Sequence, residues 1–111
     1  MHTTTQRARI RELNDAFRKT FVGGRGCLTQ GVNALSDVAR SAVIQKVRDF
    51  ADFAPDNDPH REHDFGSFEF EGDKFFWKID YYAPGMDGGS EDPSDPAVTT
   101  RVLTIMFAKE Y

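Results

Sequence analysis

The chain of 111 residues has the size of one domain and can bury a modest core. Apolar residues make up 39% of it and include ten Phe, which argues against global disorder. It has no run of about 18 apolar residues that could span a membrane, and its first residues lack the apolar stretch of a secretion signal. We therefore expect one cytoplasmic domain over residues 1–111 without membrane contact. The single cysteine, Cys27, cannot form an internal disulfide.

Charge is distributed unevenly along the chain, whose net charge is −4. Residues 1–25 hold six basic and two acidic side chains, whereas the rest hold eight basic and sixteen acidic ones. An acidic chain is a poor default partner for nucleic acid, because binding phosphates needs clustered Lys and Arg. The basic first segment is the exception, and forms either a solvated helix face or a contact for nucleic acid or an acidic partner. The arginines of this candidate contact are Arg7, Arg11, Arg18 and Arg25.

Two amphipathic helices are predicted in the first half of the chain. Apolar residues at spacings of three and four predict a helix over Thr5–Phe21, which Gly23 and Gly24 end. A second helix is predicted over Ser36–Phe53, with Ser36 as its N-cap. Between them, the short run Gly26–Val32 favours a strand.

The stretch Phe65–Tyr82 reads as a β-hairpin that is rich in aromatic residues. A loop at Gly72-Asp73 would place Phe70 opposite Phe75 and Phe68 opposite Trp77. Since side chains alternate between the two faces of a strand, one face is predicted to be the core face. That inner face carries Phe68, Phe70, Phe75, Trp77, Ile79 and Tyr81.

The remaining segments are two loops and a final strand. Pro55–Asp64 is rich in Pro, Asn and Asp, which favour turns, and the acidic, Pro- and Gly-rich residues 83–97 favour a mobile or functional loop. Val98–Tyr111 predicts a strand buried on much of both faces. The sequence therefore predicts an α+β domain in which two helices pack on one face of an antiparallel sheet of three to four strands, in the order α-β-α-β-β-β.

The outer face of the hairpin is the first candidate site. Carried outward, the predicted register places Phe65 beside Asp80 and His63 beside Tyr82. A histidine, a carboxylate and a phenol within reach of one another could perform acid–base chemistry, although a solvated sheet face gives the same pattern. The catalytic candidates are His63, Asp64 and Asp80, and the candidates for binding are Phe65, Glu69, Phe76, Lys78, Asp80 and Tyr82.

Two acidic segments raise the question of a metal site. His60 and His63 are accompanied by Asp56, Asp58 and Asp64, which are side chains that zinc, manganese or magnesium accept. The spacing matches no closed zinc pattern, and Asp and Asn in such a segment also bond the local backbone in turns. The acids of the second loop lack the alternating ligands of a calcium loop; they are Asp87, Glu91, Asp92 and Asp95. We expect no metal and no cofactor.

Several motifs resemble those of a family of small bacterial proteins that is known as a domain of unknown function. They are RIRELNDAFR, LTQGV, FAPDNDP, EHDFGSFE, FFWKIDYY and DPAVTTRVLTIMFAKEY. The resemblance covers nearly the whole chain. It implies an origin in alphaproteobacterial genomes and plasmids, and it implies no activity and no catalytic residues.

The sequence favours a non-enzymatic module that binds a protein partner or a second copy of itself. Phe76, an aromatic residue among charges on the outer sheet face, is the observation behind this expectation. The plasmid context of the family suggests a role with mobile genetic elements or in inhibiting host defence. Two alternatives remain: a small metal-dependent hydrolase or nuclease, and nucleic-acid contact through the basic first helix.

Overall fold

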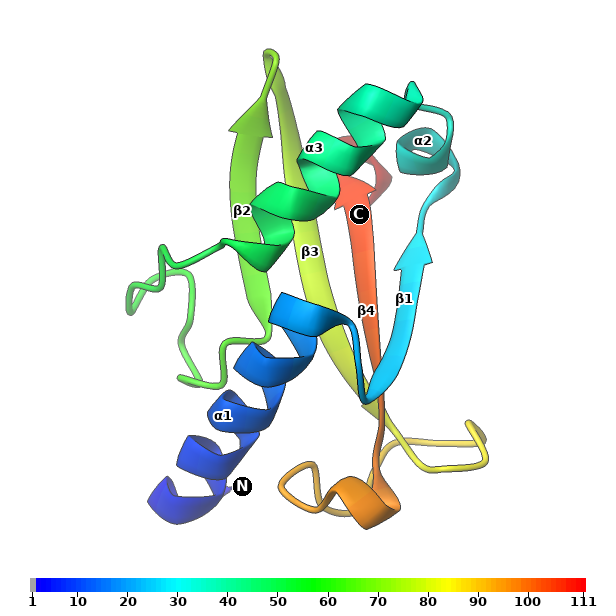
Figure 1. Cartoon of the computed structure of the whole chain (residues 1–111). Coiled ribbons are helices and arrows are strands. Elements are labelled where there is room, and N and C mark those ends of the chain that lie inside the picture. The colour runs from blue at the N-terminus through cyan, green and yellow to red at the C-terminus, as the bar shows by residue number, and fades with distance from the viewer. Residues whose placement is uncertain (1) are drawn as a thin grey trace.

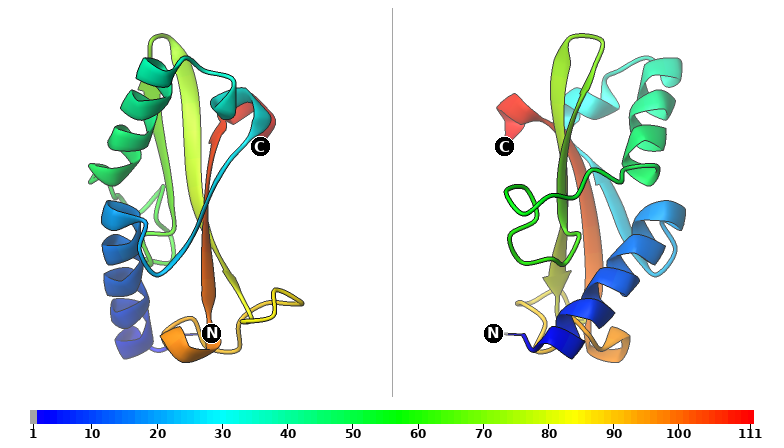
Figure 2. Two further views of the ribbon diagram at one scale, coloured as in Figure 1. Left: turned by 45° about the vertical axis from the view of Figure 1, so that its right-hand side comes forward. Right: turned by 90° about the vertical axis from the view of Figure 1, so that its left-hand side faces the viewer.

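Helices lie across one face of a four-stranded sheet in the computed structural model, which describes residues 2–111 (Figure 1). The elements are α1 Thr4–Thr20, β1 Gly24–Leu28, α2 Gln30–Asn33, α3 Asp37–Arg48, β2 Phe65–Phe70, β3 Asp73–Tyr82, η1 Pro96–Val98, β4 Thr100–Phe107 and η2 Ala108–Glu110. Seen along the sheet, α1 and α3 lie on one side and the C-terminal residues on the other (Figure 2). The predicted α+β class is confirmed. None of the helices in residues 2–111 combines the length and the apolar character needed to cross a membrane.

The sheet has the strand order β1-β4-β3-β2. The β2–β3 and β3–β4 pairs are antiparallel, as expected, whereas β1 runs parallel to β4. The pairing of β1 is not set by a hairpin, because about seventy residues separate Leu28 from Thr100 along the chain. No tight turn therefore fixes the direction of β1, and the sequence pattern of a single strand does not reveal it.

Each of the two long helices begins directly after a capping residue, of which Ser36 was predicted. Thr3 and Gln6 form a capping box at the start of α1, and the Ser36 side chain accepts a hydrogen bond from the Ala39 N–H at the start of α3. The prediction that the second helix reaches Phe53 is wrong, since α3 ends at Arg48. Pro55 disfavours helix just upstream, and the Phe50 carbonyl accepts a hydrogen bond from the Arg18 side chain.

The segment between these helices also differs from its prediction. The strand expected over Gly26–Val32 spans Gly24–Leu28 instead, and the chain then forms the short helix α2. The Thr29 N–H makes a last bond to the Ile105 carbonyl of β4 before the chain turns away from the sheet. The carboxylate of Glu110 accepts hydrogen bonds from the Thr29 hydroxyl and the Gly31 N–H, which are contacts that a local pattern does not indicate.

The hairpin turn lies at Glu71-Gly72, one residue earlier than expected. Both residues have positive φ, 50° and 84°, as a two-residue type I′ turn requires. Phe68 consequently pairs with Phe75, so the prediction that Phe68 lies opposite Trp77 is wrong by two residues. Because this shift is even, every side chain of the two strands keeps the face that alternation assigns to it.

The core lies between the inner face of the sheet and the helices. Trp77 is fully buried and meets the rings of Phe50 and Phe53 edge-on at 5.5 and 6.2 Å. Gly66 on β2 lies beside this indole, where an added Cβ would come within 2.1 Å of Trp77 Nε1. The other large members of the core are Phe17, Val32, Val43, Val47, Phe75, Ile79, Leu103 and Ile105.

The loop of residues 83–97 is tied to the sheet by hydrogen bonds. The Ser90 and Thr99 hydroxyls lie 2.7 Å apart, and Thr99 also donates to the Asp92 carbonyl at 2.9 Å. The buried guanidinium of Arg101 donates to the Pro93 carbonyl. The composition of this loop favours mobility, and it does not indicate that Thr99, just before β4, and Arg101 of β4 anchor the loop.

Replacing Gly66 with alanine is expected to destabilise the protein, because either Trp77 or Phe50 must move to accommodate the new methyl group. We expect the free energy of unfolding to fall by about 1–3 kcal/mol, measured by urea denaturation. The control is Gly88→Ala, since an added Cβ at Gly88 meets no atom within 4 Å. Equal stability of the two variants would contradict this account of Trp77 packing.

Candidate functional site

The outer face of the sheet, opposite the helices, carries the residues predicted for binding. Alternation along β2 and β3 places them there, because their neighbours Phe75, Trp77 and Ile79 point into the core. They are Phe65, Glu69, Phe76, Lys78, Asp80 and Tyr82. The predicted pairing of Phe65 is wrong, because Phe65 lies opposite Lys78 rather than beside Asp80.

Three aromatic rings meet on this face and form what we call the outer aromatic cluster, Phe65, Phe76 and Tyr111. The ring centroids of Phe65 and Phe76 are 5.1 Å apart, and Tyr111 lies 6.3 and 5.6 Å from them in edge-on contacts. Tyr111 is 76% exposed, so the cluster remains open to solvent. The sequence alone does not reveal the contribution of Tyr111, because the strand predicted over Val98–Tyr111 is too long: β4 ends at Phe107, and the position of Tyr111 depends on the 3₁₀ turn Ala108–Glu110.

Glu110 fixes the position of the segment that carries Tyr111. Its Oε1 accepts hydrogen bonds from the Thr29 hydroxyl at 2.7 Å and the Phe107 N–H at 2.9 Å, and its Oε2 accepts one from the Gly31 N–H at 2.9 Å. The Thr29 hydroxyl is the main cause that lowers the pKa of Glu110. The carboxylate thus joins the end of the chain to the β1–α2 junction.

A hollow of about 390 Å³ borders the outer aromatic cluster. It is lined by Thr29, Lys78, Thr104, Met106, Glu110 and Tyr111. Lys78 Nζ lies 2.9 Å from Asp80 Oδ2, and this hydrogen bond raises the pKa of Lys78. The face therefore combines an apolar centre with charges of both signs.

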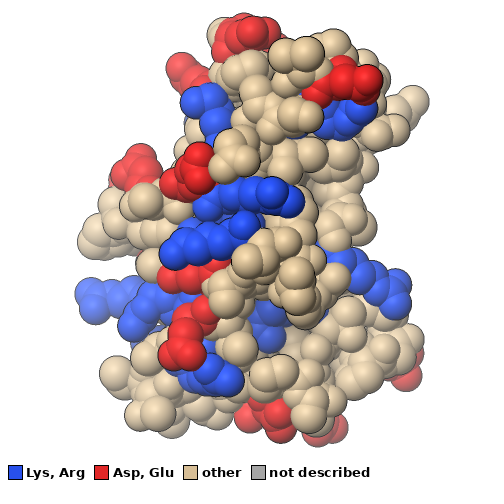
Figure 3. Space-filling model, in the orientation of Figure 1, with Lys and Arg blue, Asp and Glu red and all other residues tan. Residues whose placement is uncertain are grey.

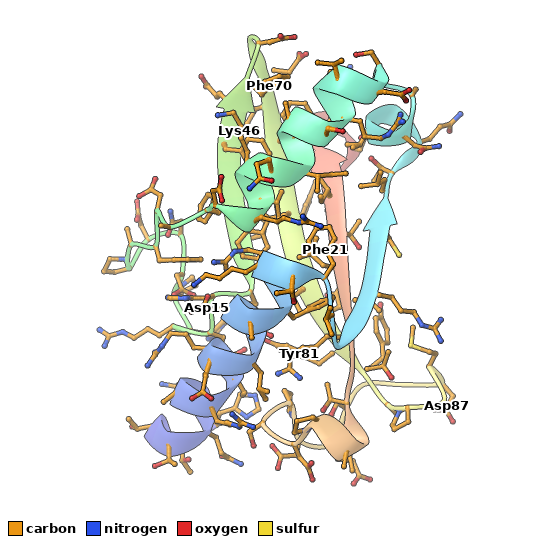
Figure 4. The ribbon with its side chains drawn as sticks, in the orientation of Figure 1. Asp15, Phe21, Lys46, Phe70, Tyr81 and Asp87 are labelled. Carbon is orange, nitrogen blue, oxygen red and sulfur yellow. The ribbon has the colours of Figure 1, made fainter. Side chains whose placement is uncertain are left out.

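His63 does not lie on the outer face, so the prediction that places it beside Tyr82 is wrong. The ladder ends at Phe65, and the chain turns at His63, whose φ is 54°. The imidazole stacks on Phe53 with ring centroids 3.6 Å apart and an interplanar angle of 4°. Figure 4 shows Asp15 on the side of α1 that faces this loop.

Both ring nitrogens of His63 face carboxylates. Nδ1 lies 2.9 Å from Asp15 Oδ1, and Nε2 lies 3.6 Å from Asp58 Oδ2. A catalytic base needs one ring nitrogen directed toward a substrate, whereas here Nδ1 attaches the loop to α1 and Nε2 faces a carboxylate of the same loop. Asp80 lies on the other face of the sheet, so the three catalytic candidates His63, Asp64 and Asp80 do not form one cluster.

A metal-site interpretation of the same segment finds no support in the geometry. Within residues 2–111, no three or more His, Cys, Asp or Glu side chains are grouped in a way that could hold a metal ion. His60 and His63 line different hollows, the first with Arg7 and Glu62 and the second with Phe53. The two histidines are therefore not arranged as a pair of ligands.

A buried polar network lies beneath α1, where the sequence pattern indicates only apolar packing. Asn14 Nδ2 donates to Tyr81 Oη at 2.8 Å and to the Glu62 carbonyl at 2.9 Å, and Tyr81 donates to Glu62 Oε1 at 2.9 Å. Arg101 Nε donates to Asn14 Oδ1 at 2.7 Å, and its guanidinium lies 5.2 Å from the Tyr81 ring centroid. Figure 4 shows Tyr81 at this position behind α1.

The titratable groups of this network respond to burial. Burial raises the pKa of the Tyr81 phenol well above its usual range and lowers the pKa of Arg101. The Tyr81 hydroxyl therefore stays protonated and donates its hydrogen bond to Glu62. Asn14 and Arg101 are polar residues in apolar patterns, which is the signal that could have indicated a buried network.

The four arginines proposed for nucleic-acid contact do not share one surface. Arg18 is buried, with its guanidinium 5.2 Å from the Phe53 ring centroid, and Arg25 lies on the edge strand β1. Arg7 and Arg11 lie on α1, and Arg11 donates to a loop carbonyl. In Figure 3 the Lys and Arg side chains on the helix face are interspersed with acidic ones.

The pKa of half-buried Asp64 is raised above its usual value of 3.8, chiefly by burial and then by Glu62. The folded state thus binds this proton more tightly than the unfolded state, so stability falls as pH rises through the interval above 3.8. We expect Asp64→Asn to raise the free energy of unfolding at pH 7, with no gain near pH 3. Urea denaturation at both pH values measures this, with the exposed Asp56→Asn as control. A loss of stability at pH 7 would contradict the prediction.

Comparison with known proteins identifies a family whose model matches this chain. The model of a family described as a protein of unknown function, DUF3768, matches residues 28–110, which include β2, β3, β4 and two of the three rings of the outer aromatic cluster. No curated protein matches the chain, and no solved structure does. Since the family model covers well over half of the sequence, the chain belongs to the DUF3768 family of proteins of unknown function.

Proposed function

We propose that this protein is a binding module for another protein and that its contact surface is the outer face of the sheet. The observation that carries the proposal is the outer aromatic cluster, three rings in mutual contact on a face that the helices leave uncovered. Clustered aromatic side chains supply much of the affinity in protein interfaces, because they bury a large apolar area at a low cost in side-chain entropy.

The charges around the cluster favour a protein partner over a nucleic acid. Lys74 and Lys78 lie on the same strand face as Asp80, and Glu69 pairs with Lys74 across the hairpin. A polyanion would meet carboxylates on this surface, whereas a protein surface can offer both signs of charge. The partner we propose therefore presents an apolar side chain to the hollow beside Tyr111, with acidic and basic groups around it.

The geometry gives less support to catalysis. His63 directs both ring nitrogens toward Asp15 and Asp58, and Asp80 pairs with Lys78. The resemblance to proteins of alphaproteobacterial genomes and plasmids suggests where to seek the partner, among proteins of mobile elements or of host defence.

The test measures binding between the purified protein and the partner captured from the native host, which is itself purified for the measurement. We expect Phe76→Ala to weaken the affinity about tenfold or more, because truncating a central aromatic residue of an interface costs about 2 kcal/mol. The matched control is Val38→Ala on α3, which removes an apolar side chain that is 82% exposed on the helix side. Circular dichroism and thermal unfolding establish that both variants fold.

Two outcomes would overturn the proposal. One is a captured partner whose affinity is the same for wild type, Phe76→Ala and Tyr111→Ala. The other is a stable dimer in light scattering that Phe76→Ala dissociates, which would assign the outer face to a second copy of this chain instead of a different protein.

A further inference from the structure

A hollow of about 410 Å³ opens beside the first half of α1, away from the outer aromatic cluster. It is lined by His2, Arg7, His60 and Glu62. This volume is within the range of small-molecule sites, about 300–1,000 Å³. The hollow borders the buried polar network, because Glu62 belongs to both.

Glu62 supplies a buried carboxylate with one oxygen that lacks a hydrogen-bond donor among the described residues. The residue is 6% exposed, and its Oε1 accepts a hydrogen bond from Tyr81 at 2.9 Å. The closest basic group to Oε2 is His2 Nε2 at 3.7 Å, which is beyond hydrogen-bond range. Oε2 is not among the fully buried side-chain atoms that lack a partner, and Glu62 lines the hollow. Oε2 is thus an accessible acceptor to which a ligand in the hollow could donate.

The surrounding network holds this carboxylate in place. Asn14 donates to the Glu62 carbonyl at 2.9 Å and to the Tyr81 hydroxyl at 2.8 Å, so main chain and side chain are both fixed from α1. Arg101 donates to Asn14 and is 4% exposed, and it places a buried positive charge behind the network. A ligand would therefore meet a preorganised carboxylate, which reduces the entropy lost on binding.

The wall formed by α1 carries the opposite charge. Arg7 lines the hollow, and no carboxylate within residues 2–111 lies within 4.0 Å of its guanidinium. Glu62 and Arg7 thus face one hollow without forming an ion pair with each other. A molecule that carries an ammonium and a carboxylate complements both, because the first donates to Glu62 Oε2 and the second accepts from a guanidinium.

We propose that this hollow binds a small zwitterion, a free α-amino acid being the simplest member of the class, with its ammonium on Glu62 and its carboxylate on Arg7. On this proposal the ammonium takes the position beside Oε2 that His2 Nε2 occupies at 3.7 Å. The site is separate from the outer face of the sheet, so its test and that of the protein contact fail independently.

The experiment screens the full chain against the twenty standard amino acids by thermal shift, and follows any that bind by titration calorimetry. Two probes separate the charges: glycine betaine keeps the carboxylate but has no N–H donor, and ethylamine keeps the ammonium alone. We expect at least one amino acid to bind, and both probes to bind about tenfold more weakly or worse, since each loses one charged hydrogen bond.

Three variants locate the site. Glu62→Gln keeps an acceptor for Tyr81 but replaces Oε2 with a donor, and Arg7→Met removes the guanidinium; each is expected to weaken binding about tenfold or more. Arg9→Met is the matched control, because Arg9 lies on the same helix and pairs with Glu12 outside the hollow. Should Glu62→Gln fail to fold, Arg7→Met alone decides, because its side chain is on the wall and not in the buried network.

Two results would overturn the inference. One is that no amino acid at 10 mM, about the weakest binding worth assigning to a site, shifts either the melting temperature or the amide resonances of residues 60–62. The other is binding that Glu62→Gln and Arg7→Met leave unchanged, which would place the ligand elsewhere.

Discussion

The packing of α1 depends on the contacts that the buried guanidinium of Arg18 makes. It is 2% exposed and lies 5.2 and 5.3 Å from the ring centroids of Phe53 and Trp77. A guanidinium removed from water needs polar partners; Asp15 supplies one to Nη1 and the Phe50 carbonyl one to Nη2, whereas Nε has none among the described residues. Because these groups come from α1, from the segment after α3 and from the centre of the sheet, one side chain fixes three parts of the fold relative to one another.

The same requirement extends into the loop before β2. Asp15 accepts from Arg18 and also contacts His63, whose ring stacks on Phe53. The loop is therefore held by a helix far earlier in the chain as well as by its own side chains, such as Asn57 and Asp58, which bond to its backbone. Below it, Asn14, Tyr81 and Arg101 continue the polar contacts, so α1 meets the sheet through hydrogen bonds as well as through Phe17, whereas α3 meets it through apolar side chains such as Val43 and Val47.

Local rules were sufficient for the two long helices, the four strands and the two faces of the hairpin, but not for α2 or the turn at Ala108–Glu110. Alternation assigned Phe75 and Trp77 to the core and Phe76 to the outer face, and the two-residue error in register left these assignments intact because side chains repeat every two residues. The turn was predicted one residue too late. Gly72-Asp73 suits a turn with positive φ as well as Glu71-Gly72 does, and the sequence does not show that Glu71 adopts a positive φ.

The remaining errors concern contacts between distant parts of the chain. His63 was assigned to the outer face because the ladder was assumed to continue, whereas attraction to Asp15 and stacking on Phe53 turn it toward α1. Arg18 was grouped with surface arginines because of its charge, although its helical spacing from Ile10 and Phe21 places it on the buried side of α1. Tyr111 could not be assigned without knowing that Glu110 bonds to Thr29 and Gly31.

The bridge from Glu110 to the β1–α2 junction makes the outer aromatic cluster conditional on a local equilibrium. If residues 108–111 unfold together while the sheet stays folded, Tyr111 moves away from the outer aromatic cluster and only Phe65 and Phe76 remain in contact. The apparent affinity of such a surface is its intrinsic affinity multiplied by the fraction of molecules in the closed state. Thr29 and Gly31 would thereby influence recognition through that fraction, although the rings they help to position belong to other parts of the chain.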